Sequence, residues 1–398
     1  MQQIRKDIQR LAARHHPDTV GLRRHLHQNP ELSYREEQTG RFIAECLKEW
    51  GISYEHGIAE HGVVALIRGK KDGSGVVALR ADMDALPIAE ANEVPYKSRN
   101  EGVMHACGHD VHTASLLGAA RILQELRTSF GGTVKLLFQP AEEKLPGGAS
   151  IMIREGALEN PRPEAIFGQH VHPPLEVGKI GLRPGPYMAS ADELYLRVQG
   201  KGGHAALPHE FVDPVLISAH ILTALQQIVS RNARPTTPSV LSFGHIQSDG
   251  GATNVIPNAV HLQGTFRTFD EQWRFEAHQR MRQLVRHLAE GMGGSAELRI
   301  EVGYPALQNN DALTLQARQW AVDYLGASQV VDLPIRMTAE DFAYYSQVMP
   351  ACFYRLGTGN AARGITSPIH TNTFDVDEAS LEVGSGLMAW LALSRLVS

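Results

Sequence analysis

The stretch "VHTASLLGAARILQELRTSFGGTVKLLFQPAEE" (residues 111–143) places a helical pattern directly before the pattern of a buried strand. Apolar residues recur at helical spacing through residues 111–126, and the apolar run that follows ends in two glutamates. Residues 62–69 and 75–84 are further β-branched runs bounded by glycine. Strands that alternate with helices predict an α/β fold, whose mainly parallel sheet is covered by helices on both faces.

The pattern changes near Gly185. From residue 193 to residue 305 the order becomes strand, helix, two strands, helix and strand, which is that of a ferredoxin-like α+β unit. Within it, Asp213 and Pro214 have the residue types of an N-cap and a first helical position. The α/β pattern then resumes. We therefore expect a small domain of residues 186–301, inserted into a larger domain of residues 1–185 and 302–398.

Composition limits the class of protein. The 398 residues carry a net charge of −5 and no basic patch, so nucleic acid is not an expected partner. No stretch reaches the length of a membrane span, and the first residues lack the apolar core of a secretory signal. The three cysteines lie far apart, which favours a reducing compartment over a disulfide framework. These features predict a cytoplasmic globular protein.

Residues that suit metal sites gather where the predicted strands end. Ligands of open α/β sheets bind at the carboxyl ends of strands, so these residues are expected to lie together. They are Asp82 and Asp84 after one strand, Cys107 and His109 in the turn before a helix, Glu142 and Glu143 after the next strand, His170 and His172 after another, and His370 near the end of the chain.

The triplet "CGH" (residues 107–109) is the most compact part of this set. A lone buried cysteine is usually a small apolar side chain. Here Gly108 lets the backbone turn so that the thiol and the imidazole converge, which favours a metal site. Asp84 has the chemistry of a turn residue, but a ligating histidine usually gives its other ring N–H to a carboxylate. We therefore expect Asp84 to support the site.

The pair Glu142 and Glu143 suggests the reaction. Adjacent acidic residues are common on solvated surfaces, but these follow an apolar strand. Two neighbours on irregular backbone point in different directions, so one can bind metal while the other handles a proton. A metal lowers the pKa of water towards about 7, and a carboxylate beside that water can carry its proton to a leaving nitrogen. This division of roles suits amide hydrolysis.

The chain resembles the M20 metallopeptidase superfamily, and within it the amidohydrolase branch of hippurate hydrolases, N-acyl-amino-acid deacylases and auxin-conjugate hydrolases. The motifs that carry the resemblance span nearly the whole chain in order. They are "RRHLHQNPELS" (23–33), "RADMDALPI" (80–88), "MHACGHDVHTASLLGAA" (104–120), "FQPAEE" (138–143), "GKGGHAALPH" (200–209), "NVIPNAV" (254–260), "GTFRTF" (264–269), "AEDFAYY" (339–345) and "IHTNTFDVDE" (369–378).

The resemblance implies two divalent metal ions, with Cys107 bridging them. It also implies that Glu142 is the general base and that Asp84 is a supporting carboxylate. Mixed sulfur, nitrogen and oxygen donors suit Mn, Zn, Co or Ni. The implied ligands are Cys107, His109, Glu143, His170 and His370.

For the inserted domain, the resemblance implies a lid that also mediates homodimerisation. His204 would stabilise the oxyanion of the tetrahedral intermediate. Without the resemblance, the glycine-rich sequence around His204 would indicate only a turn between a strand and a helix. Asn254 and Arg267 would bind the carboxylate of the substrate. Lys144 and Pro146 depart from the glycine-rich loop of similar proteins. This departure bears on which substrate is preferred and not on the hydrolysis reaction itself.

The leading hypothesis is a binuclear metallo-amidohydrolase that cleaves N-acyl amino acids, with no nucleic-acid or membrane partner. One alternative is a dipeptidase or aminopeptidase with the same residues, although no acidic partner for a free amine is evident. A second alternative is a non-catalytic metal-binding homologue. The presence of Glu142 and of every implied ligand argues against it.

Overall fold

The computed structural model describes residues 1–397 and consists of two compact units. The first contains Met1–Gly185, Gln308–Pro334 and the chain from Asp341 onward, and the second contains Pro186–Leu307 and Ile335–Glu340. Residues 335–340 join the second unit through backbone hydrogen bonds to residues 187–189. The sequence pattern did not predict that residues 335–340 belong to the second unit, because they form no helix or strand.

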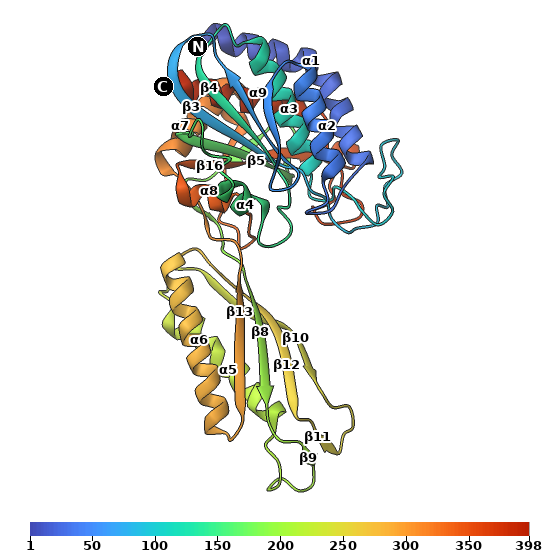
Figure 1. Ribbon diagram of the computed structural model, residues 1–398, viewed down its shortest axis with the longest axis vertical. Helices are drawn as coiled ribbons and strands as arrows, with labels where there is room; N and C mark the ends of the chain where they lie inside the picture. Colours follow the sequence, from blue (N-terminus) through green and yellow to red (C-terminus); the bar gives the residue numbers. More distant parts are fainter. Residues whose placement is uncertain (398) are drawn as a thin grey trace. The chain divides into compact units, whose positions relative to one another are not determined.

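The first unit is built on a mixed eight-stranded sheet (Figure 1). Its central strands β4, β3, β5 and β16 are parallel, as the alternating pattern predicts. The pairs β1–β2, β2–β4 and β16–β6 are antiparallel, whereas the edge pair β6–β15 is parallel, so the sheet is mixed rather than uniformly parallel. In sheet order the strands are β1 (Ser53–Ile58), β2 (Gly62–Arg68), β4 (Gly131–Gln139), β3 (Lys71–Asp82), β5 (Ala165–Glu176), β16 (Ala351–Gly359), β6 (Ile180–Leu182) and β15 (Val330–Asp332).

Helices cover this sheet on both faces. Helices α1, α2, α3 and α9 pack with one another and with one face, while α4 and α8 lie against the other (Figure 1). The helices are α1 (Gln2–Gln28), α2 (Glu37–Glu49), α3 (His109–Glu125), α4 (Gly148–Arg154), α7 (Asp311–Leu325), α8 (Ala343–Val348) and α9 (Ser380–Val397), with 3-10 turns at Ala327–Gln329 and Ala361–Arg363.

Strand β4 shows how the two faces differ. Val134, Leu136 and Phe138 are fully buried in the apolar core beneath α3 and α9. Lys135 points to the other face, where its buried ammonium donates to the carbonyls of Ala157 (2.9 Å) and of residue 159 (2.6 Å). The charge of Lys135 therefore fixes the chain that follows α4 against the sheet.

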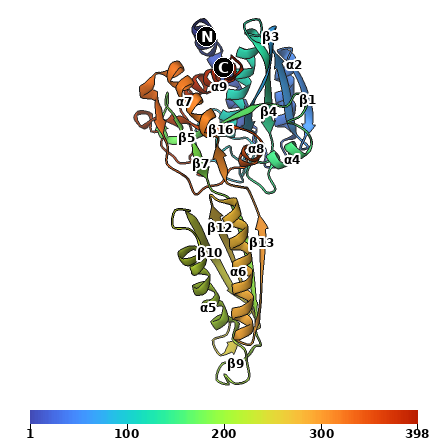
Figure 2. The same cartoon turned by 90° about the vertical axis from the view of Figure 1, so that its left-hand side faces the viewer.

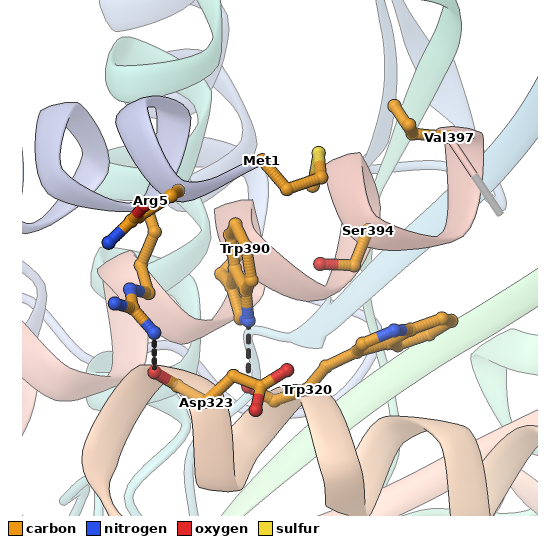
Figure 3. Close-up of a pocket in the computed structure, with 8 residues that line it drawn as sticks. Met1, Arg5, Trp320, Asp323, Trp390, Ser394 and Val397 are labelled. Carbon is orange, nitrogen blue, oxygen red and sulfur yellow. Dashed lines mark hydrogen bonds between the residues drawn. The ribbon is translucent and has the colours of Figure 1, made fainter.

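The ends of α1, α7 and α9 are tied together by side chains (Figure 3). Trp390 donates its indole N–H to the Trp320 carbonyl at 2.7 Å, and Arg5 donates to the Asp323 carbonyl at 2.6 Å. These four residues line a surface pocket of about 480 Å³. None of the residues expected to bind metal or substrate lines this pocket.

The second unit is a four-stranded antiparallel sheet with two helices on one face (Figure 2). Its chain order of strand, helix, two strands, helix and strand, with sheet order β10-β12-β8-β13, is that of a ferredoxin-like unit. Asp213 caps α5 as predicted, since its carboxylate accepts the N–H groups of Val215 and Leu216. The elements are β8 (Asp192–Gln199), α5 (Pro214–Gln227), a π-helical turn (Ile228–Asn232), β10 (Ser239–Ser248), β12 (Ala259–Thr268), α6 (Glu271–Gly291) and β13 (Ser295–Val302).

Two short two-stranded sheets complete the strands. One consists of β9 (Gly203–His204) and β11 (Val255–Ile256), and the other of β7 (Gly185–Met188) and β14 (Leu307–Asn309). Strand β1 was not expected from the sequence, because its residues are almost all exposed and lack an alternating apolar pattern.

Among residues 1–397, none of the helices combines the length and the apolar character needed to cross a bilayer.

A buried ion network holds the second unit together and gives a first prediction. The carboxylate of Asp192 accepts hydrogen bonds from Arg274 and from His278 Nε2 at 2.6 Å, and all three side chains are buried. Asp192→Ala would remove the buried carboxylate that pairs with Arg274 and His278 and would leave Arg274 with the partly exposed Glu271. We expect a loss of about 3–5 kcal/mol in the free energy of unfolding.

Urea unfolding followed by circular dichroism measures this loss. The matched control is Asp332→Ala, which removes an exposed carboxylate paired with Arg318 and should change stability by less than about 1 kcal/mol. Equal losses in the two variants would contradict the assigned role of Asp192.

Candidate metal centre

The residues singled out at the strand ends lie at one edge of the first unit's sheet. Strand β3 ends at Asp82, β4 leads into Glu142 and Glu143, and His170 lies within β5. Because β3, β4 and β5 are parallel, their carboxyl ends meet at the same edge. Helix α3 begins there at His109, so the structure brings these groups together as their positions in the sequence suggest.

Cys107 lies between two histidines. Its Sγ is 3.4 Å from Nε2 of His170 and 3.3 Å from Nε2 of His370. The turn depends on Gly108, which has a φ of +83° and whose added Cβ would lie 2.6 Å from a methyl group of Val171. Only glycine fits both constraints, so the thiol and His109 can leave the backbone in the required directions.

Glu143 connects the remaining donors. Its Oε1 lies 3.4 Å from Nε2 of His370 and 3.9 Å from Nε2 of His109. Both Glu143 Oε1 and His109 Nε2 are buried and have no hydrogen-bond partner. Buried polar atoms are rarely left unsatisfied, so these two atoms fit ligands whose partner is a cation.

The ring orientations of two histidines suit this arrangement. His109 donates from Nδ1 to Asp84 Oδ1 at 3.1 Å, and His170 donates from Nδ1 to the Val171 carbonyl at 2.8 Å. When neutral, both rings therefore carry their lone pair on Nε2, which is the nitrogen that faces the other donors. Histidine ligands are commonly oriented in this way by a hydrogen bond on the opposite side of the ring.

The charge balance also favours a cation. Burial alone would lower the pKa of His109, but the carboxylates of Asp82 and Asp84 outweigh it and raise this pKa to about 10. Burial, followed by the charge of Glu143, raises the pKa of the Cys107 thiol well above its usual range. The carboxylates that stabilise a positive charge on His109 would equally stabilise a divalent cation at this place, and a bound metal would hold Cys107 as a thiolate.

Glu142 is buried beside these donors. One of its carboxylate oxygens lies within 4.8 Å of ligand atoms of His109 and Glu143. Its Oε1 accepts a long hydrogen bond from the Asp341 N–H at 3.4 Å. The carboxylate therefore lies close enough to the donors to act on a molecule bound among them.

Arg80 and His112 support the site, although neither was expected to do so from the sequence. Arg80 donates to Asp82 and to Asp341, each at 2.6 Å, and all three are fully buried. His112, which was left out of the expected ligands, uses both ring nitrogens, one toward Asp82 and one toward the Val171 N–H. The alternation of "RAD" in the strand was the available signal, because it places Arg80 and Asp82 on the same face.

The three residues expected to meet the substrate lie in the second unit. His204 and Asn254 are neighbours, since β9 pairs with β11 and the Ala205 N–H donates to the Asn254 carbonyl at 3.0 Å. Arg267 lies at the opposite end of β12, eight residues beyond Ala259, which is about 27 Å along an extended strand. The structure therefore does not bring Arg267 together with the other two within this unit.

Known proteins share this fold and sequence. Residues 78–394 match the model of peptidase family M20/M25/M40. An N-acetyl-L-cysteine deacetylase from Bacillus subtilis is 42% identical over 363 residues, covering 91% of this chain and 84% of that protein. An N-acyl-L-amino acid amidohydrolase from Geobacillus stearothermophilus is 45% identical over 307 residues, covering 77% and 82%. A solved dinuclear metal-binding peptidase of the M20 family from Bacillus subtilis has a TM-score of 0.83 and 36% identity, covering 96% and 98% of the two chains.

The fold, the buried donor cluster and these relatives define a metal-binding hydrolase that acts on C–N bonds. The chain belongs to peptidase family M20/M25/M40.

The position of Asp84 gives a second prediction. Its carboxylate contacts His109 and also accepts the Ser33 hydroxyl at 2.6 Å and the Glu143 N–H at 3.0 Å. Asp84→Asn keeps the shape but removes the charge that orients His109. We expect metal affinity to fall about 10- to 100-fold, measured by competition with a chromogenic chelator. Ser33→Ala removes one of the three contacts and should have a smaller effect, whereas an unchanged affinity in Asp84→Asn would contradict this role.

Proposed function

We propose that the protein hydrolyses the amide bond of N-acyl amino acids, such as N-acetyl or N-benzoyl derivatives, with Glu142 as general base. The main support is the position of Glu142 beside the unpartnered buried atoms of His109 and Glu143. The two curated relatives described above are named for deacetylation of N-acetylcysteine and for hydrolysis of N-acyl amino acids. Each acts on the kind of bond that this site would cleave.

We propose further that the centre holds two divalent ions, drawn from Mn, Zn, Co or Ni. Cys107 lies between His170 and His370, which suits a bridging ligand. When bound, the metal pair polarises the amide carbonyl and makes water a strong nucleophile near neutral pH. The proposed ligands are Cys107, His109, Glu143, His170 and His370.

Glu142 would carry the proton in this reaction. Its carboxylate takes the proton from the attacking water as the new C–O bond forms. It then delivers that proton to the leaving nitrogen as the C–N bond breaks, so that the amino acid departs as an amine. Burial shields the carboxylate from bulk water, which keeps the proton within the site.

His204 would stabilise the oxyanion from the second unit, which we propose acts as a lid. Its Nδ1 accepts the Ala206 N–H at 3.1 Å, so the ring proton is on Nε2. This N–H is on an exposed side chain and can donate to a negative oxygen. Asn254, its neighbour, would bind the substrate carboxylate.

Arg267 would contact the substrate from a different copy of the chain. Arg267 lies about 27 Å along β12 from Ala259, at the end of β12 that follows Asn254 and β11, so one lid cannot place Arg267 and Asn254 on the same small substrate. A homodimer through the lid would resolve this separation, since each site would receive Arg267 from one subunit and His204 with Asn254 from the other. Val215 and Leu216 on α5 and Ile246 on β10 are exposed apolar residues that could form the contact.

The substrate class gives a third prediction. Metal-stripped protein is given Mn²⁺, Co²⁺, Ni²⁺ or Zn²⁺ and tested on N-acetyl, N-benzoyl and longer N-acyl amino acids beside matched dipeptides. We expect metal-restored amine release from the acyl amino acids. Glu142→Gln should lower kcat by about 10²- to 10⁴-fold, because it removes proton transfer. Its metal content should stay unchanged, whereas Glu143→Gln should lose metal.

Turnover confined to dipeptides would replace this proposal with the peptidase alternative. Binding of two metals without turnover of any compound would mean that the metal centre is real and that the proposed substrate class is wrong.

The shared site gives a fourth prediction. A His204→Ala variant and an Arg267→Ala variant are each expected to be nearly inactive. After unfolding and refolding together, half of the dimers would be mixed and each would regain one intact site, so activity should recover to about a quarter of wild type. No recovery would show that both residues serve a site from the same subunit.

The dimer itself is tested by a variant of the lid. Leu216→Asp on α5 should give monomers in sedimentation, whereas Leu315→Asp, at a similarly exposed position on α7, should leave the dimer intact.

A further inference from the structure

The loop that carries Glu142 and Glu143 has an unusual backbone. This carboxylate loop (residues 140–148) begins after β4, and its Ala141 has a φ of +54°. A left-handed conformation costs an L-residue about 1–2 kcal/mol, so the surroundings must hold it in place. Glu142 and Glu143 follow at once, and the direction of both side chains therefore depends on the conformation of Ala141.

Both backbone polar groups of Ala141 are held. Its carbonyl accepts the Gly148 N–H at 2.9 Å, which closes the loop. Its N–H donates to Oε1 of Glu36 at 2.7 Å. Gly148 packs so closely that an added Cβ would lie 1.8 Å from the Pro140 carbonyl oxygen. The loop is thus closed on itself by one bond and fixed to the rest of the unit by the Glu36 carboxyl.

Glu36 lies in a segment that contacts this loop repeatedly. Ser33 donates to Asp84, whose carboxylate also accepts the Glu143 N–H. Tyr34 donates its hydroxyl to the Lys144 carbonyl at 3.1 Å and accepts the Gly147 N–H at 3.2 Å. Residues 33–36, which we call the brace segment, therefore contact the carboxylate loop directly at Ala141, Lys144 and Gly147, and reach Glu143 through Asp84.

The Glu36 side chain is fully buried, which is costly for a carboxyl group. Burial, followed by the charge of Asp84, raises its pKa to about 8, so the group is mostly uncharged near pH 7. An uncharged carboxyl resembles a glutamine amide in shape and keeps the same acceptor oxygen. What the site needs at this position is therefore an acceptor at a fixed distance rather than a negative charge.

We propose that Glu36 is a positioning residue, which holds Ala141 in its left-handed conformation and so directs Glu142 and Glu143 into the metal centre. The inference rests on the proposed function for the roles of those two glutamates. It does not depend on which substrate is cleaved, because the position of Glu143 can be followed through metal binding alone.

The chain contains a matched control for this arrangement. Ala59 also has a left-handed backbone, with a φ of +52°, and its N–H donates to Oε2 of Glu155 at 2.6 Å. Neither Ala59 nor Glu155 contacts a proposed ligand. The same chemical contact is therefore present once beside the carboxylate loop and once away from it.

The experiment compares Glu36→Gln and Glu36→Leu with Glu155→Gln and Glu155→Leu in the full-length protein. Each variant is loaded with Co²⁺, and its visible absorption spectrum, its Co²⁺ affinity, kcat and KM are measured. Glu36→Leu should weaken Co²⁺ binding and lower kcat by about 10- to 100-fold and should alter the spectrum, with KM little changed. Glu36→Gln should restore all of these to within about threefold of wild type.

Both Glu155 variants should keep the wild-type spectrum, affinity and kcat, even where stability falls. If Glu36→Leu behaves like Glu155→Leu, Glu36 has only a structural role and the proposal is wrong. Should Glu36→Leu fail to fold, Glu36→Asp replaces it, because the shorter side chain cannot reach the Ala141 N–H. A wild-type protein that binds Co²⁺ normally but cleaves no acyl amino acid would overturn the proposed substrate, while the spectra would still test Glu36.

Discussion

The carboxylate of Asp84 is the contact on which the metal centre depends. It is fully buried and meets three segments that are distant in the sequence: Ser33, His109 at the start of α3, and the N–H of Glu143 after β4. A single buried anion thereby sets the orientation of one proposed ligand and the backbone position of another. The arrangement is stable only if the charge of Asp84 is balanced, which Ser33, His109 and the backbone N–H achieve together.

The sequence predicted that the proposed ligands lie together, because their positions follow from strand ends. Parallel strands gather their carboxyl ends at one edge, so the sequence alone indicates that Asp82, Glu143 and His170 lie together. The contact between Glu36 and Ala141 could not be found in this way. It depends on a left-handed alanine, and no residue type in that stretch signals such a conformation.

In the second unit, too, some features could be predicted from the sequence and others could not. Its ferredoxin-like order was evident from alternating strand and helix patterns, and the cap at Asp213 was correct in detail. The separation of Arg267 from Asn254 was not evident, because sequence motifs give the order of residues and not the distances between them in space. Only the extent of β12 shows that Arg267 lies at the end of this strand away from Asn254 and β11, and that separation is the main support for a shared site.

The two unpartnered buried atoms of the metal centre also have a thermodynamic consequence. Folding without a cation buries Oε1 of Glu143 and Nε2 of His109 without a hydrogen-bond partner, so part of the free energy of folding is spent on desolvating these two atoms. A ligand that binds only the folded state stabilises it in proportion to the logarithm of its concentration. The cellular supply of metal would therefore set how long the chain survives as well as how fast it works.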